Sequence, residues 1–174
     1  RIGLEVFEGL LNELAVEKKI LNMGTGYCLP GFKAELSRKD TALWEKIEPI
    51  LMNGAMKPPV VSEIASILNL EANTLSKFMI KVARLGKVCQ VSKNRFLLPE
   101  FVDALANHAD ELGRSNSDLG FSAAEFRDKT DIGRNLSIEV LEFFDKSGFT
   151  WRTGDTRKVL KSVTEVFGDN RSDS

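Results

Sequence analysis

The sequence predicts a mainly α-helical chain with small β wings, organised as tandem winged-helix (helix-turn-helix) domains. Apolar residues recur at the three- and four-residue spacing of helix faces in several short segments. Groups of these segments end in two short apolar runs around a turn, which is the pattern of a β-hairpin. Two hairpins close on the same dipeptide, Leu29-Pro30 and Leu98-Pro99. This recurrence, at about 60 to 70 residues, indicates a repeated module and is longer than a solenoid period.

Bulk composition limits the classes of function. The chain has 174 residues, is 43% hydrophobic and carries a formal net charge of −1. This length suits one domain or several small modules. Because the net charge is close to zero, any nucleic-acid site must be a local patch of cations. No run of about 18 apolar residues occurs, so neither a membrane span nor a membrane partner is expected.

The sequence contains no recognisable catalytic or metal-binding motif. Cys28 and Cys89 are far apart and His108 is the sole histidine, so a zinc site of Cys or Cys/His type cannot be assembled. Lone cysteines in apolar runs are typical of buried thiols in a reducing cytoplasm. The glycine patterns of phosphate-binding loops do not occur. We therefore expect a cytoplasmic protein whose chain has no catalytic residue, no metal site, no cofactor and no enzyme activity.

Residues 1–38 are predicted to form the C-terminal part of one winged helix. Residues 4–17 show the apolar spacing of a helix, and two short strands follow on either side of a glycine turn at 24–26. The chain begins at Arg1 and not at Met, and enters this helix almost at once. This beginning suggests a fragment of a longer protein.

Residues 39–99 are predicted to form a complete winged helix, and its first helix is marked by a cap and a stop. Asp40 or Thr41 is expected to cap this helix. Pro49 lies inside it and is expected to bend or shorten it, because proline lacks the amide donor. The helix is expected to end near Gly54.

The rest of this module follows the order of a winged helix. An extended segment at 58–61 precedes a second helix, which Ser62 is expected to cap. A third helix spans 72–85 and stops at Gly86, whose backbone tolerates the conformation of a helix end. The wing is then predicted as two strands around a turn at 92–94.

Residues 100–167 are predicted to form the last winged helix, around which we organise the functional hypothesis. A helix at 100–112 and a polar loop at 113–119 precede a short strand, two helices and a basic hairpin. The second of these helices opens on Gly133-Arg134-Asn135. Residues 168–174 form a polar tail that is expected to be frayed.

The last module concentrates positive charge. Its hairpin region, residues 150–161, has four basic residues against one acid, Asp155. These basic residues are Arg152, Arg157, Lys158 and Lys161. The start of the helix at Arg134 adds backbone amides and a helix dipole, both of which favour a phosphate. An ordinary solvated face of charges is the alternative that the pattern leaves open.

Two aromatic residues have alternative interpretations. Trp151 adjoins Arg152 in a predicted strand, where alternation directs the two side chains to opposite faces. If Arg152 faces a ligand, Trp151 is expected to pack inward. Phe121 is expected to be a core residue, although an aromatic before the helix could also support an unstacked base.

The last module closely resembles the C-terminus of the bacterial selenocysteine-specific elongation factor. The resemblance depends on a long pattern of residues between 121 and 160. It comprises Phe126-Arg127-Asp128, Gly133-Arg134-Asn135, Leu141-Glu142-Phe143-Phe144-Asp145, Gly148-Phe149-Thr150, Arg152 and Gly154. The earlier modules resemble the preceding winged helices of that factor more loosely. Trp151 departs from the pattern, because a basic residue is common at this point of such hairpins.

This resemblance implies a function in translation. The family's factor resembles the GTPase that delivers ordinary tRNA, and it ends in four winged helices, of which this chain would hold part of the second and all of the third and fourth. The last one binds a stem-loop in the messenger, the selenocysteine insertion element, beside an in-frame UGA codon. The implied partners are the mRNA hairpin and, through the whole factor, the ribosome and selenocysteinyl-tRNA. GTP and magnesium are expected in upstream domains, and the chain is expected to be a monomer.

We expect an RNA-binding site in the last module that combines phosphate contacts with a pocket for a flipped base. The candidate residues are Phe121, Ser122, Arg127, Gly133, Arg134, Asn135, Arg152, Gly154, Arg157 and Lys158. Two alternatives remain open. One is a transcriptional regulator that inserts the same helix-turn-helix into the major groove of DNA. The other is a protein-interaction scaffold, which would leave the basic hairpin without a ligand.

Overall fold

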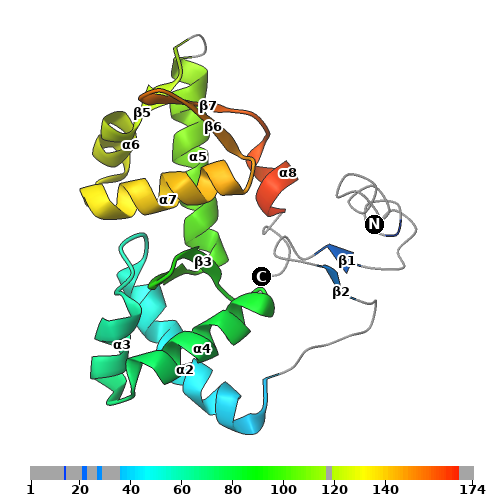
Figure 1. Cartoon of the computed structure of the whole chain (residues 1–174), viewed down its shortest axis with the longest axis vertical. Helices are drawn as coiled ribbons and strands as arrows, with labels where there is room; N and C mark the ends of the chain where they lie inside the picture. Colours follow the sequence, from blue (N-terminus) through cyan, green and yellow to red (C-terminus); the bar gives the residue numbers. More distant parts are fainter. Residues whose placement is uncertain (1–13, 15–20, 23–26, 29–35, 117–118, 169–174) are drawn as a thin grey trace, which may run out of the picture.

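The chain folds into two complete winged helices that stand end to end (Figure 1). The computed structural model describes residues 14, 21–22, 27–28, 36–116 and 119–168. Most of them are helical, and the strands form small antiparallel sheets. We call residues 38–98 the middle module and residues 99–167 the last module. The predicted fold class is confirmed.

A two-stranded hairpin precedes the middle module. β1 (Leu21–Asn22) pairs antiparallel with β2 (Tyr27–Cys28), and Leu21 lies opposite Cys28. Both strands fall within segments that the sequence predicts as strands. The turn predicted at 24–26 and, apart from Leu14, the helix predicted over 4–17 lie outside the described residues.

The middle module consists of three helices and a two-stranded wing. Its elements are α2 (Arg38–Gly54), α3 (Val61–Leu68), α4 (Ala72–Arg84), β3 (Cys89–Ser92) and β4 (Arg95–Leu97). Helix α4 buries Leu75, Met79 and Val82 on one face, as their helical spacing predicts. These side chains pack against Trp44 and Ile47 of α2, which forms the first hydrophobic core.

Helix α2 begins earlier than predicted and is not interrupted by its proline. Its cap is Ser37, whose Oγ accepts a hydrogen bond of 3.2 Å from the backbone N–H of Asp40, so neither Asp40 nor Thr41 is the cap. The helix continues through Pro49 to Gly54. Pro49 is exposed, so water can satisfy the carbonyl that loses its amide partner.

The start of α3 agrees with the predictions only in part. Val60 keeps the extended backbone expected for 58–61, but the segment forms no strand and Val61 already belongs to the helix. Val61 makes a single backbone bond to the wing turn, from its N–H to the carbonyl of Asn94 at 2.9 Å. The helix begins at Val61 because its cap is Val60, whose backbone N–H donates to the Glu63 carboxylate at 2.8 Å. The predicted cap, Ser62, therefore lies inside the helix.

The last module repeats this plan with a third strand and one more helix. Its elements are α5 (Pro99–Ser115), β5 (Phe121–Ser122), α6 (Ala123–Thr130), α7 (Arg134–Lys146), β6 (Thr150–Thr153), β7 (Thr156–Val159) and α8 (Val163–Phe167). The strand order is β5-β7-β6. Helix α5 is longer than predicted and takes up the first residues of the loop expected at 113–119.

Gly120 is required for the chain to enter β5. Its φ of +72° lies in the left-handed region, and a Cβ at this position would collide with the backbone carbonyl of Arg157 in β7. The glycine therefore allows the loop after α5 to approach the central strand of the sheet.

Phenylalanine rings fill the centre of the last module. Phe121, Phe126, Phe144 and Phe149 are all fully buried. Phe144 lies edge-on to Phe149 with ring centroids 5.1 Å apart, and Phe126 lies 6.3 Å from both Phe121 and Phe144. Aromatic pairs in tilted or edge-on geometry are favourable beyond their buried area.

Helix α8 closes this core and was not predicted. Phe167 of α8 stacks on Phe143 with ring centroids 6.0 Å apart. The sequence does carry a signal for this helix. Ser162 and Glu165 form a capping box, in which the carboxylate accepts from the backbone N–H of Ser162 at 2.8 Å.

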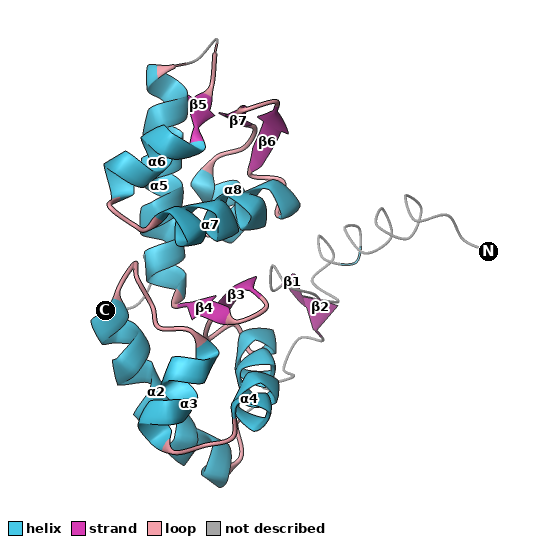
Figure 2. Cartoon of the chain, turned by 60° about the vertical axis from the view of Figure 1, so that its left-hand side comes forward, coloured by secondary structure: helices cyan, strands magenta, loops and turns pink. Residues whose placement is uncertain are grey.

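The two modules pack directly on one another (Figure 2). Val91 and Leu97, from the wing of the middle module, belong to the hydrophobic core of the last module, and β3 packs against α7. Arg95 of β4 lies at the same contact. Its Nε donates to the Glu139 carboxylate of α7 at 2.9 Å, and its Nη1 donates to the carbonyl of Pro58 at 2.6 Å.

We predict that Leu97→Ala destabilises the last module as well as the wing to which Leu97 belongs. Removing a fully buried leucine costs about 2–5 kcal/mol, and here the cavity opens beneath α7. The measurement is urea unfolding combined with hydrogen exchange of the α7 amides. Lys93→Ala, at the exposed wing turn, is the matched control and should change stability by less than about 0.5 kcal/mol. Wild-type exchange of α7 in Leu97→Ala would contradict the shared core.

Candidate nucleic-acid interface

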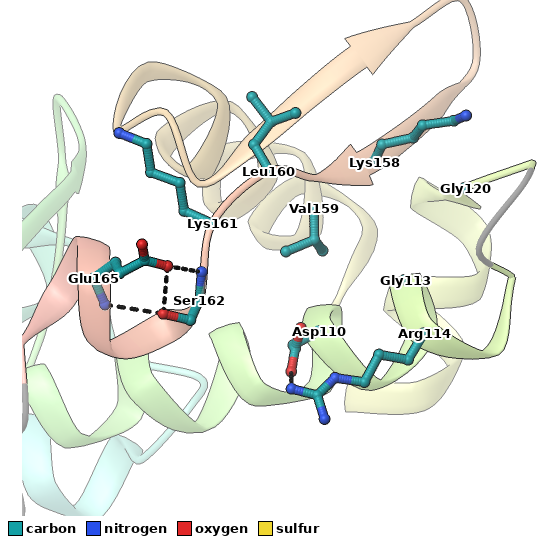
Figure 3. A pocket seen from close by; sticks show the side chains of 10 residues that line it. All are labelled: Asp110, Gly113, Arg114, Gly120, Lys158, Val159, Leu160, Lys161, Ser162 and Glu165. Carbon is teal, nitrogen blue, oxygen red and sulfur yellow. Dashed lines mark hydrogen bonds and ion pairs between the residues drawn. The ribbon is translucent and has the colours of Figure 1, made fainter.

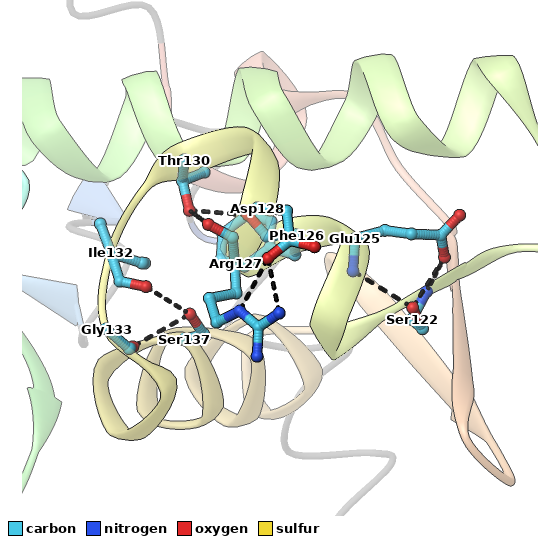
Figure 4. A network of polar contacts seen from close by, with 9 residues as sticks. All are labelled: Ser122, Glu125, Phe126, Arg127, Asp128, Thr130, Ile132, Gly133 and Ser137. Atoms are coloured by element: carbon cyan, nitrogen blue, oxygen red, sulfur yellow. Dashed lines mark hydrogen bonds and ion pairs between the residues drawn. The ribbon is translucent and has the colours of Figure 1, made fainter.

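The helix-turn-helix of the last module is held rigid by short polar contacts (Figure 4). The hydroxyl of Ser137 is buried and donates to the carbonyls of Ile132 at 3.2 Å and Gly133 at 3.1 Å. Thr130 closes the end of α6 by donating to the carbonyl of Phe126 at 2.7 Å. The turn is therefore fixed, and the start of α7 has a defined position.

The start of α7 lacks an anion of its own. Its N-cap is Gly133, which provides no side chain to accept from the first amides, and its first turn has no acidic residue. By contrast, α6 and α8 begin with capping boxes in which a glutamate carboxylate lies at the helix start. Free amides and the positive end of the dipole make the start of α7 a favourable place for a phosphate.

Space remains open around this helix start. Gly133 has an ordinary φ of −59°, and a Cβ added there would meet nothing within 4 Å. Arg134 and Asn135 follow it and are both exposed. These three residues therefore lie together at an accessible helix end, as the sequence predicts.

A groove between α6 and α7 adjoins this helix end. Its volume is about 310 Å³. It is lined by Ala123, Ala124, Arg127, Arg134, Ser137 and Ile138. The guanidinium of Arg127 is half-exposed and donates to the carboxylate of Asp128 at 2.6 and 2.8 Å. Arginines on the two helices thus give the groove positive groups with small apolar walls between them, which suits a planar base next to a phosphate.

Two of the predicted site residues have structural roles instead. Phe121 is fully buried beside Phe126, so it cannot act as a platform for a base. Ser122 caps α6: its Oγ accepts from the N–H of Glu125 at 3.2 Å, and its own N–H donates to that carboxylate at 2.7 Å. Its partly exposed side chain is therefore engaged within the fold.

Arg157 is also misassigned as a ligand contact. It is only 4% exposed, and its Nε donates to both carboxylate oxygens of Asp145, at 3.0 and 3.3 Å. Thr150 donates to the same carboxylate at 2.6 Å. Arg157 lies opposite Phe121 in the sheet, so alternation turns it toward the core. Its charge stabilises the attachment of the hairpin to α7 and is not presented to solvent.

The wing presents a different set of side chains to solvent. Arg152 and Lys158 are exposed, and the Nε of Arg152 donates to the carbonyl of Gly154 at 2.9 Å. Gly154 has a φ of +61°, so it serves the tight turn. Trp151 is 64% exposed, which contradicts the expectation that it packs inward. Trp151 pairs with Lys158 across the strands, and both point away from the core.

A second hollow, of about 470 Å³, lies where β7 passes α5 and α8 (Figure 3). Lys158, Lys161 and Arg114 line it, together with the carboxylates of Asp110 and Glu165. Arg114 pairs with Asp110 at 2.6 Å. The sequence did not single out Arg114, because it adjoins the wing only through the long-range contact between α5 and β7.

Metal binding finds no support in the part of the chain that the structure describes. Among those residues no group of histidine, cysteine and carboxylate side chains could hold a metal ion. Cys89 is a free thiol, and burial raises its pKa to about 11, so it is a poor nucleophile. No helix among them is long and apolar enough to cross a membrane.

These features define a class of protein, a tandem winged-helix protein whose last module exposes a cationic wing and an uncapped helix start. The family model described as "Elongation factor SelB, winged helix" matches residues 116–159. The selenocysteine-specific elongation factor of Escherichia coli K12 is 30% identical over 127 residues, which cover 73% of this chain and 20% of that protein. The factor of Desulfomicrobium baculatum is 26% identical over 133 residues, or 76% of this chain and 21% of that protein. The chain thus spans about a fifth of the length of these relatives.

Solved structures agree with this similarity. The mRNA-binding domain of elongation factor SelB from E. coli, in complex with SECIS RNA, superposes with a TM-score of 0.65 at 27% identity, over 72% of this chain and all of that chain. A bacterial elongation factor EF-Sec shares the fold, with a TM-score of 0.56 at 18% identity, over 90% of this chain and 24% of that chain. Residues 116–159 therefore match the SelB winged-helix family model, and the chain resembles the C-terminal winged-helix region of the selenocysteine-specific elongation factor. The resemblance inferred from the sequence is confirmed.

We predict that Arg157→Ala lowers stability, whereas Arg152→Ala does not. The first change leaves the partly buried carboxylate of Asp145 without its cation, which costs about 2–4 kcal/mol. The second removes an exposed side chain and should cost less than about 0.5 kcal/mol. Urea unfolding of both variants gives the free energies of unfolding. Equal stability of the two variants would show that the buried pair does not hold the wing.

We predict a pH dependence from the capping box of α6. The pKa of the Glu125 carboxyl is lowered mainly by the hydrogen bond from the backbone N–H of Ser122, and further by the bond from the Ser122 hydroxyl. A lowered folded-state pKa contributes stability that is present above the ordinary glutamate pKa and is lost as the pH falls through the lowered value. The stability difference between wild type and Glu125→Gln should therefore shrink as the pH falls through this range. Unfolding curves from pH 6 down to about pH 3 test this, and a constant difference would contradict it.

Proposed function

We propose that this chain is the mRNA-binding part of a selenocysteine-specific elongation factor. The last module would bind a stem-loop in the messenger and so hold the factor, with its GTPase and selenocysteinyl-tRNA, at an in-frame UGA codon. The observation that carries the proposal is the uncapped start of α7, flanked by Arg134 and the groove toward Arg127. The superposition on a SelB domain that was solved in complex with SECIS RNA supports it.

The site divides the binding of such a hairpin into two tasks. Cations at Arg134 and on the exposed wing would neutralise backbone phosphates and supply affinity. The groove between α6 and α7 would take an unpaired base and supply specificity. Gly133, which no protein atom crowds, would allow the RNA backbone to approach the amides of α7.

The packing of the modules argues against the DNA-binding alternative. A recognition helix that enters the major groove must be free along the face that it inserts. Here β3 packs along α7, and Glu139 in the middle of that helix is paired with Arg95. The accessible surface is instead the start of the helix and the wing, which suits the outside of a folded RNA.

The remaining features of the proposal concern the longer protein. GTP and magnesium would bind domains that belong to the whole factor, so we propose no catalysis by this chain. The ribosome and the tRNA would be partners of that factor, and its place of action would be the cytoplasm. We also propose that the chain acts as a monomer.

We predict that Arg134→Ala and Gly133→Ala both weaken binding to a messenger hairpin taken from downstream of an in-frame UGA codon. Arg134→Ala should weaken binding about tenfold and reduce the slope of log Kd against log salt by about one, because one phosphate contact is lost. Gly133→Ala should weaken binding, because its Cβ would occupy the open space beside the amides of α7, and it should cost no more than about 1 kcal/mol of stability, because alanine is a poorer N-cap than glycine. Fluorescence anisotropy with labelled RNA at several salt concentrations gives both quantities.

Lys46→Ala is the control for this experiment, because Lys46 is an exposed cation on α2 of the middle module. It should leave affinity and salt dependence unchanged. Wild-type affinity of Arg134→Ala for the hairpin would refute the proposed site. Tighter binding of the chain to duplex DNA would favour a regulator, and no binding to either nucleic acid would favour a protein-interaction scaffold.

A further inference from the structure

Trp151 occupies an exposed position that the fold does not explain. It lies in β6 with 64% of its surface exposed, whereas its neighbour Thr150 is buried. The contacts that attach the wing to the module are made on the other face of the hairpin, by Thr150 and Arg157 to Asp145. Trp151 therefore makes no contribution to the core, and its indole is left facing solvent.

The surroundings of Trp151 are cationic and polar. Its cross-strand partner is Lys158, so the two side chains leave the hairpin on the same face. Thr153 and Thr156, which pair with each other at the next outward-facing position, are polar. Leu160, two residues beyond Lys158, is 57% exposed and adds a small aliphatic neighbour on this side of the wing. One flat aromatic ring beside a cation is thus the main feature of this face.

This combination fits a single nucleotide better than a protein surface or a membrane. Bases stack on exposed aromatic rings because every base has a π-face, and a lysine beside the ring can pair with the phosphate of the same strand. A protein or lipid partner would need a contiguous apolar patch, and the threonines interrupt one here. The positive charge of the wing also favours a polyanion.

We infer that Trp151 is a stacking platform for an unpaired base of the bound RNA, with Lys158 on an adjacent phosphate. This inference rests on the proposed function and deepens it. It assigns to the wing a contact with a base in addition to its phosphate contacts. It also requires the hairpin to offer an unpaired nucleotide at the wing, at a different place from the groove beside Arg127.

The test compares Trp151→Ala and Trp151→Phe on two RNAs: the messenger hairpin, and a fully paired version of it without unpaired nucleotides in the stem. Trp151→Ala should bind the hairpin about tenfold more weakly than wild type, and Trp151→Phe should stay within about threefold, because phenylalanine still stacks. On the paired RNA the three proteins should bind alike. Ile67→Ala is the matched control, since Ile67 is also 64% exposed but lies on α3.

Intrinsic fluorescence provides a second readout. The chain has 2 tryptophans, and Trp44 is buried in the first core, so the hairpin should quench mainly Trp151. In Trp151→Phe the hairpin should cause little quenching. Wild-type affinity of Trp151→Ala for the hairpin, or an equal loss on the paired RNA, would overturn the inference. Quenching by anionic vesicles and not by the hairpin would also overturn it, because the occupant would then be a membrane surface.

The failure of this inference is distinguishable from the failure of the proposed function. If Arg134→Ala weakens hairpin binding and Trp151→Ala does not, the RNA-binding site stands and only the stacking contact is wrong. If neither the wild type nor any variant binds the hairpin, both are wrong.

Discussion

The burial of the middle wing beneath α7 is the constraint on which the rest of this structure depends. In a free winged helix the wing and the recognition helix are both exposed and both available to a ligand. Here Val91 and Leu97 of the middle wing lie in the core of the last module, and Arg95 links that wing to Glu139 of α7. The strands of the middle wing are thereby committed to packing, although the turn at Lys93 stays exposed, and one flank of α7 is covered. In the described part of the chain, the helix start, the α6 side and the last wing remain open.

This packing also decides which cations can reach a ligand. A chain with a net charge of −1 cannot attract RNA by its overall field, so the location of each positive group matters. Arg95 and Arg157 are held inside the structure by carboxylate partners, since a buried guanidinium without one would be strongly unfavourable. Arg134 and Lys158 are exposed. Arg157 and Lys158 thus adjoin each other in the sequence but point to opposite faces of the sheet.

Local sequence signals predicted the helices and strands well. They predicted poorly which face of the last wing each side chain occupies. The start of α7 at Gly133-Arg134 and both wings follow from turn residues and apolar spacing, which act within a few residues. The orientation of Trp151 and Arg157 depends instead on the pairing of β7 with β5, which lies far away in the sequence. Alternation alone gives two equivalent choices of face. The assumption that a basic residue faces the ligand selected the wrong one for Arg157.

The starts of α6, α7 and α8 differ in how their first amides are satisfied. Helices α6 and α8 each begin with a serine–glutamate capping box, in which hydrogen bonds from Ser122 and Ser162 lower the pKa of the Glu125 and Glu165 carboxyls and satisfy donors at the helix start internally. Helix α7 has a glycine there and an arginine next, so its amides need an external acceptor. Water can serve in the free protein, but a phosphate gains both the dipole and the adjacent guanidinium. The same helix is fixed from behind by the middle wing, so its free end is presented in a defined direction. Rigid support on one side and unsatisfied donors on the other are what a preorganised site for a folded polyanion requires.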